Sequence, residues 1–245
     1  GWSRVKYPLL SGFMIAAVFV FATNAYAVKC NTVLSKYKIY QTESFPIPSK
    51  ISNQAHALKR TGWLNHKIPK HKAESVWQHT KKFEKATLIL FSKAKEATRN
   101  RAGLVALVHD LGEVIAGDFT PFDNITKEEK YQLEKKAIES LAPQFGANQD
   151  RLLELWLEYD LQTSEISPYL KDLDKIDAAI QAMVYLKQGY KVESFLDYAK
   201  QVIKTPELRR VYDYILTEFS RDRNISPYKV YYKALEDISV QFSAF

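Results

Sequence analysis

Residues 102–113 read AGLVALVHDLGE. The first seven residues are all apolar or small, as is typical of a buried helical segment. His109 and Asp110 follow directly, so a polar pair ends a buried segment, where desolvation is costly without a compensating cation. On a helix, Glu113 would lie on almost the same face as His109. The stretch therefore predicts a helix that carries a metal-binding pair with a carboxylate beside it.

Two further stretches supply matching ligand types. His79 ends ESVWQH at residues 74–79, and Asp174 lies within KDLDK at residues 171–175. Two imidazoles and two carboxylates suit a divalent transition ion and leave coordination positions open for water and a phosphate oxygen. A lone histidine is more often an ordinary buried or surface residue, and this remains the alternative for His79 and His109.

The rest of the chain indicates helices nearly throughout. They are expected near residues 52–64, 75–96, 98–115, 148–159, 192–203, 206–219 and 227–240. A longer helix is expected to begin at Ser164 or at Ser167-Pro168 and to continue through Lys187. Another begins at a capping box, Thr126 with Glu129, and ends at Pro143 and Gly146. No run shows the sustained alternation of apolar and polar residues that is typical of a β-strand, and glycine is scarce. The sequence therefore predicts an all-α bundle with the metal site at its centre.

The order His, His-Asp, Asp resembles the HD-domain superfamily, and longer strings are similar to its 5′-deoxynucleotidase branch. These strings are RTGW (60–63), ESV (74–76), ALVHDLGE (106–113), GD (117–118), TP (120–121), DNI (123–125), KEEK (127–130), LW (155–156), EY (158–159) and KDLDK (171–175). They extend from about residue 52 to 190. The resemblance implies an HD-domain helical bundle with a central metal site.

The resemblance also implies roles for individual residues. His79, His109, Asp110 and Asp174 would bind the metal. Glu113 would position or deprotonate the attacking water, and Asp118 would assist near the leaving group or the phosphate.

Three residues are candidates for substrate binding, each with a simpler alternative. Trp63 would stack on the nucleotide, or be a core anchor, and Arg60 would pair with phosphate, or be a solvated side chain. Thr120 lies in a loop, where it could bond a water or phosphate oxygen, or only form the turn. Glu158, Glu165 and Asp177 fit exposed helical faces and are left out of the catalytic set.

The implied activity is metal-dependent removal of the 5′-phosphate from (deoxy)nucleoside monophosphates. Resemblance favours one Mn²⁺ or Co²⁺, while the ligands leave Zn²⁺, Fe²⁺ and Mg²⁺ open, and a homodimer is also open. One alternative is an HD phosphohydrolase for a cyclic dinucleotide, a guanosine tetraphosphate or a nucleoside triphosphate. Another is a non-catalytic nucleotide- or partner-binding module.

The N-terminus indicates a leader. Arg4 and Lys6 precede an apolar stretch, residues 9–21, and the small-residue pattern Ala-Tyr-Ala ends at Ala27. Residues 1–27 are therefore predicted to be a signal peptide or, if uncleaved, a membrane anchor and the sole membrane contact. An irregular lead-in (28–50) and the catalytic domain (51–245) would follow. We expect export to the periplasm or the medium, or a cytoplasmic enzyme if the leader is not functional.

Composition agrees with one globular enzyme domain. The net charge of +7 is modest, which favours a small anionic substrate over a nucleic-acid polymer. Cys30 is the single cysteine, so no internal disulfide can form and stability must come from packing and bound metal.

Overall fold

A computed structural model describes residues 45–245, and over that range the chain forms helices without a β-strand. The described helices belong to one compact unit. They are α2 (Ser49–Ala57), α3 (Thr61–Asn65), α4 (Val76–Leu90), α5 (Glu96–Val108), α6 (Glu113–Ala116), α7 (Lys127–Leu141), α8 (Gln149–Leu161), α9 (Ser167–Lys187), α10 (Glu193–Val202), α11 (Pro206–Arg221) and α12 (Pro227–Ile238), with the 3₁₀ helices η1 (Ala142–Asn148) and η2 (Ser239–Phe242). The predicted all-α fold is confirmed.

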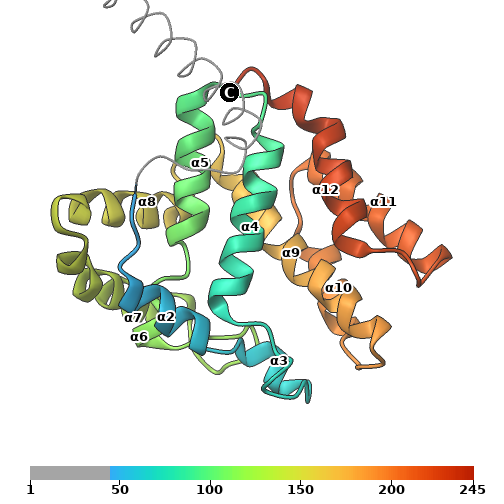
Figure 1. Cartoon of the computed structure of the whole chain (residues 1–245), viewed down its shortest axis with the longest axis horizontal. Coiled ribbons are helices and arrows are strands. Elements are labelled where there is room, and N and C mark those ends of the chain that lie inside the picture. Colours follow the sequence, from blue (N-terminus) through green and yellow to red (C-terminus); the bar gives the residue numbers. More distant parts are fainter. Residues whose placement is uncertain (1–44) are drawn as a thin grey trace, which may run out of the picture. The chain divides into compact units, whose positions relative to one another are not determined.

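Helix α4 is central to the bundle. It packs against α5, α9 and α12, while α5 also packs against α8. Figure 1 shows α4 and α5 side by side, with α7 and α8 towards one side and α11 and α12 towards the other. Leu90, Leu104 and Ile176 are fully buried between these helices, and each contributes about 1.5–3 kcal/mol relative to an exposed position.

Side chains fix the starts of two helices. Ser75 Oγ accepts a hydrogen bond from Gln78 N at 3.1 Å, and Gln78 Oε1 accepts one from Ser75 N at 2.8 Å. The same reciprocal pair joins Thr126 and Glu129 at the start of α7, as predicted from the sequence. The box at Ser75 sets the start of α4 one turn before His79.

Two predicted helices are each broken in two. Residues 52–64 divide into α2 and α3 around an antiparallel bridge between Lys59 and Ser75. Residues 98–115 divide at Val108, where the chain makes a tight turn before α6: Leu111 N bonds the carbonyl of Val108, three residues back. Gly112 lets this turn pack on α7, because a Cβ there would lie 3.2 Å from the carbonyl oxygen of Glu134.

The described end of the predicted lead-in belongs to the core. Phe45 is buried, and its ring centroid lies 5.6 Å from that of Phe145. Helix α2 then begins at Ser49, inside the stretch predicted to be irregular. The domain boundary predicted at residue 51 therefore falls within a helix.

Candidate metal centre

Three parts of the bundle bring the predicted ligands together. His79 projects from the first turns of α4, Asp174 comes from the middle of α9, and His109 and Asp110 lie in the turn after α5. His79, His109 and Asp174 are buried, while Asp110 is partly exposed. The turn, rather than a continuous helix, presents the His-Asp pair.

The four donor atoms cluster tightly. His79 Nε2 lies 2.9 Å from Asp174 Oδ1 and 3.8 Å from Asp110 Oδ2. His109 Nε2 lies 2.9 Å from Asp110 Oδ2 and 3.9 Å from Asp174 Oδ1. Ligand atoms of His79, His109 and Asp174 all lie within 4.8 Å of one another. Two nitrogens and two oxygens therefore face one small volume.

Each imidazole is oriented through its other nitrogen. His79 Nδ1 lies 2.7 Å from Asp177 Oδ2, and His109 Nδ1 donates to the carbonyl oxygen of Ala106 at 2.7 Å. Such partners fix the tautomer and aim Nε2 at a metal. The sequence interpretation of Asp177 as an exposed residue is wrong, since Asp177 is fully buried. Its spacing from Asp174, three residues along one helix, was the signal that could have found it.

Hydrogen bonds to its second oxygen hold Asp174 in place. Oδ2 accepts hydrogen bonds from Tyr159 Oη at 2.8 Å and Lys175 Nζ at 2.9 Å. Burial raises the pKa of Asp174, but Lys175 and His79 outweigh burial and hold that pKa well below its usual value. Asp174 is therefore an ionised carboxylate with one oxygen left for a ligand.

The protonation of His79 has a similar origin. Burial and Arg60 lower the pKa of the imidazole, but hydrogen bonds to Asp174 and Asp177 raise it to about 9. Asp174 and Asp177 favour a positive charge at His79, and a bound cation would supply that charge in place of the proton. His109 Nε2 is buried and faces the carboxylates of Asp110 and Asp174, but makes no hydrogen bond of acceptable geometry among residues 45–245. A buried nitrogen that faces two carboxylates fits a divalent metal site.

Glu113 begins α6 next to this centre. It is buried, and its Oε2 makes no hydrogen bond within the described part of the chain. Burial and the neighbouring carboxylates Asp110 and Asp118 raise its pKa well above the usual value. A carboxylate of raised pKa is a stronger base than an ordinary glutamate, as removal of a proton from water requires.

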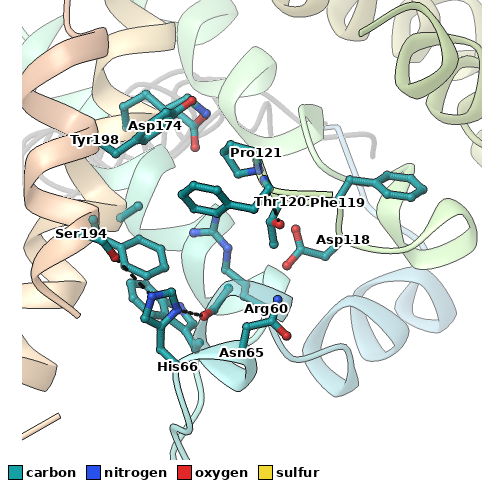
Figure 2. A pocket seen from close by; sticks show the side chains of 16 residues that line it. Arg60, Asn65, His66, Asp118, Phe119, Thr120, Pro121, Asp174, Ser194 and Tyr198 are labelled. Atoms are coloured by element: carbon teal, nitrogen blue, oxygen red, sulfur yellow. Dashed lines mark hydrogen bonds and ion pairs between the residues drawn. The ribbon is translucent and has the colours of Figure 1, made fainter. Parts of the chain in front are cut away.

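Asp118 lies in the loop after α6. Its Oδ2 accepts from Thr61 N at 2.6 Å, and its carbonyl oxygen accepts from Thr61 Oγ1 at 2.9 Å. Burial raises the pKa of Asp118, although Arg60 and the Thr61 amide oppose the change. Thr120 Oγ1 accepts from Phe122 N at 3.3 Å and so takes part in the local turn. Both residues face the cavity that Figure 2 shows.

The cavity beside the ligands encloses about 220 Å³. Asp174, Lys175, Arg60 and Asp118 line it with charged groups, and Phe119, Phe122, Phe195 and Tyr198 add aromatic surface. In Figure 2, Arg60 extends between His66 and Ser194 on one side and Asp118 and Thr120 on the other. One continuous cavity thus joins charged groups to aromatic rings.

Two predicted substrate residues have particular surroundings. The Arg60 side chain is 20% exposed and Nη1 lies 4.0 Å from Glu74 Oε2, so Arg60 is not a freely solvated surface residue. Trp63 is 1% exposed, donates from Nε1 to Glu74 Oε2 at 3.0 Å and stacks on Phe195 at 4.3 Å between centroids. One face of the indole is therefore covered by a ring that the sequence interpretation missed.

Comparison with known proteins agrees with this arrangement. A family model described as an HD domain matches residues 53–211. The chain belongs to the HD-domain family. The Dictyostelium discoideum protein named 5′-deoxynucleotidase HDDC2 is 40% identical over 153 residues, covering 59% of this chain and 79% of that protein. The human protein of that name is 30% identical over 181 residues, covering 72% of this chain and 86% of that protein.

A solved structure extends the comparison to the fold. A conserved hypothetical protein from Pyrococcus furiosus matches this HD domain with a TM-score of 0.55 and 27% sequence identity. The match covers 70% of this chain and 96% of that one. The predicted resemblance to the HD superfamily, in its 5′-deoxynucleotidase-like branch, is confirmed.

The prediction that the HD domain is exported is wrong. The chain aligns with eukaryotic 5′-deoxynucleotidases, and this relationship gives export no support. In residues 45–245, no helix is long and apolar enough to cross a bilayer. Export was inferred from residues 1–27 alone, and these lie outside the described residues together with residues 28–44.

Proposed function

We propose that this HD domain is a metal-dependent phosphomonoesterase that removes the 5′-phosphate from deoxynucleoside and nucleoside monophosphates. The convergence of four donor atoms beside a charged and aromatic cavity, which Asp174 lines, carries the proposal. The names of the relatives, 5′-deoxynucleotidases at 30–40% identity, support the substrate class. The catalytic domain is assigned to residues 45–245, which adds Phe45 and the start of α2 to the predicted range 51–245.

His79, His109, Asp110 and Asp174 hold one divalent ion, with Mn²⁺ or Co²⁺ favoured. When bound, the ion acidifies a water molecule and offsets the charge of the phosphate. The protein orients the ligands: Asp177 and the Ala106 carbonyl keep both imidazoles aimed at the ion.

Glu113 and Asp118 transfer the protons of the reaction. The water oxygen forms a bond to phosphorus as the bond to the 5′-oxygen breaks, and Glu113 takes a proton from the water. Asp118 gives a proton to the departing 5′-oxygen. Burial raises the pKa of both carboxyls, which brings them closer to the range where one can accept and the other donate.

Cationic groups on the cavity bind the phosphate. Arg60 Nη1 is buried without a hydrogen-bond partner in residues 45–245, and Lys175 Nζ lies at the cavity beside Asp174. A guanidinium can bind two phosphate oxygens at once. Thr120 is placed to add a hydroxyl contact, and Trp63 supports the pocket. A homodimer stays a prediction.

Phosphate release from a nucleotide panel tests the function. The panel contains deoxynucleoside and nucleoside 5′-monophosphates, a nucleoside triphosphate and a cyclic dinucleotide, each with Mn²⁺ or Co²⁺ and with chelator. We expect release from the monophosphates alone, abolished by chelator. Hydrolysis of the cyclic dinucleotide or the triphosphate without the monophosphates would reject the assignment, and inactivity on all would favour a binding module.

A further inference from the structure

The ring of Phe195 on α10 packs against α3 at Gly62. A Cβ added at Gly62 would lie 3.1 Å from Phe195 Cζ, tighter than nine in ten real contacts of that kind. Glycine at this position therefore lets the phenyl ring lie directly on the backbone of α3. On that helix the ring stacks on Trp63 at an interplanar angle of 26°.

A polar contact joins the same two helices at the cavity. His66 Nδ1 lies 2.9 Å from the carbonyl oxygen of Gly62, and His66 Nε2 lies 3.2 Å from Ser194 Oγ (Figure 2). The carbonyl can only accept, so Nδ1 carries the proton and Nε2 accepts from the Ser194 hydroxyl. His66 also packs its ring against Phe195 at 5.0 Å, nearly edge-on. These contacts hold Phe195 in one position.

Phe195 differs from Trp63 in accessibility. Trp63 is almost completely buried, whereas Phe195 is half-buried and lines the same cavity as Asp174 and Arg60. An aromatic ring that has a rigid backing and is only half-buried on the lining of a cavity can stack with a ligand, since its position is set before the ligand binds. The cationic side chains of Arg60 and Lys175, which line the cavity, are suited to phosphate.

We infer that Phe195 is the platform against which the nucleobase of the substrate lies, with Trp63 and Gly62 as its support. The inference rests on the proposed function and deepens it by dividing the cavity into a phosphate end at Asp174 and a base end at Phe195. Because every base has an aromatic face, a platform of this kind gives affinity with little choice among bases. The enzyme then accepts purine and pyrimidine monophosphates within about tenfold of one another.

Comparing two phosphomonoesters in the Phe195→Leu variant tests the inference. One substrate is dAMP, and the other is 2-deoxyribose 5-phosphate, which has the same phosphate and sugar without a base. We expect kcat/KM for dAMP to fall by roughly tenfold to a hundredfold, the usual range for a lost stacking contact. Activity on the base-free substrate should stay within about twofold.

Two further variants separate stacking from folding. Gly62→Ala adds the Cβ that would push Phe195, and should give a smaller loss on dAMP alone. Tyr214→Leu removes an aromatic ring from α11 that is 52% exposed and outside the lining of the cavity, and should leave both substrates unchanged. Thermal melting of all three variants checks that each is folded.

A binding measurement makes the inference independent of catalysis. Saturation-transfer NMR with 2′-deoxyadenosine, a nucleoside without phosphate, should show transfer to the base protons in the wild type and its loss in Phe195→Leu. Equal losses on dAMP and the base-free substrate, or no loss on either, would overturn the role of Phe195. A wild type that hydrolyses neither substrate but binds the nucleoside through Phe195 would instead reject the proposed activity.

Discussion

His79 Nδ1 lies 2.7 Å from Oδ2 of Asp177, a fully buried carboxylate almost one helical turn beyond Asp174. Helix α9 therefore contacts both nitrogens of one imidazole, because Asp174 Oδ1 lies 2.9 Å from Nε2. Tyr228 Oη donates to the other oxygen of Asp177 at 3.2 Å and holds it in place. The ligand residue and its orienting residue come from one rigid element.

Replacing Asp177 should weaken metal binding. Loss of an orienting carboxylate typically costs tenfold to a hundredfold in metal affinity, so we expect about that loss in Asp177→Ala and a smaller one in Asp177→Asn, whose amide oxygen can still accept from Nδ1. Competition with a chromophoric chelator measures the affinity. Asp172→Asn is the control, since Asp172 is also buried on α9 but accepts from Thr205 N at 2.7 Å. Equal losses in both variants would mean that Asp177 is merely structural.

Mn²⁺ should stabilise the fold through His109. A ligand at a hundred times its Kd adds about 2.7 kcal/mol, which for a domain of this size raises Tm by roughly 5 to 10 °C. His109→Ala removes the buried Nε2 and should abolish the shift, while His71→Ala, which changes an exposed histidine, should retain it. Differential scanning calorimetry with and without Mn²⁺ measures both. A full shift in His109→Ala would exclude His109 as a ligand.

Glu113→Gln should separate catalysis from metal binding. Glutamine keeps the size of the side chain but cannot take a proton, and proton transfer of this kind contributes about a hundredfold to ten-thousandfold to the rate. We expect kcat on dAMP to fall by that factor with metal affinity nearly unchanged. Glu165→Gln, at an exposed position, is the matched control. An unchanged kcat would remove Glu113 from the mechanism.

The structure shows why much of the fold was predictable from the sequence. Local signals set the helix starts, as at the Thr126 capping box and at the Ser167-Pro168 pair of α9. Ligand types were recognisable because histidine and aspartate beside apolar runs need a reason to be buried. The meeting of His79 with Asp174, 95 residues apart, agrees with that expectation.

Other features depend on contacts between distant segments. Asp177 looked like an exposed residue because its partner, His79, lies on another helix. Phe195 was overlooked because its neighbour Gly62 is more than 130 residues away in the chain. The break after Val108 was not predicted either, because no proline interrupts residues 109–113 and the close approach of Gly112 to α7 is a contact between distant segments.

That break gives the last prediction, because Gly112 sits where the turn meets α7. An added Cβ would lie 3.2 Å from the Glu134 carbonyl oxygen and 3.3 Å from Ile138 Cγ1, so Gly112→Ala must push the turn away from α7. Overpacking of this kind costs about 1–3 kcal/mol. Since the turn carries Asp110, Mn²⁺ affinity should fall along with the urea midpoint. Gly146→Ala, at a positive φ with open space around its Cβ in the described structure, should lower the midpoint alone. If Gly112→Ala lost stability but bound Mn²⁺ normally, the position of the turn would not control the metal centre.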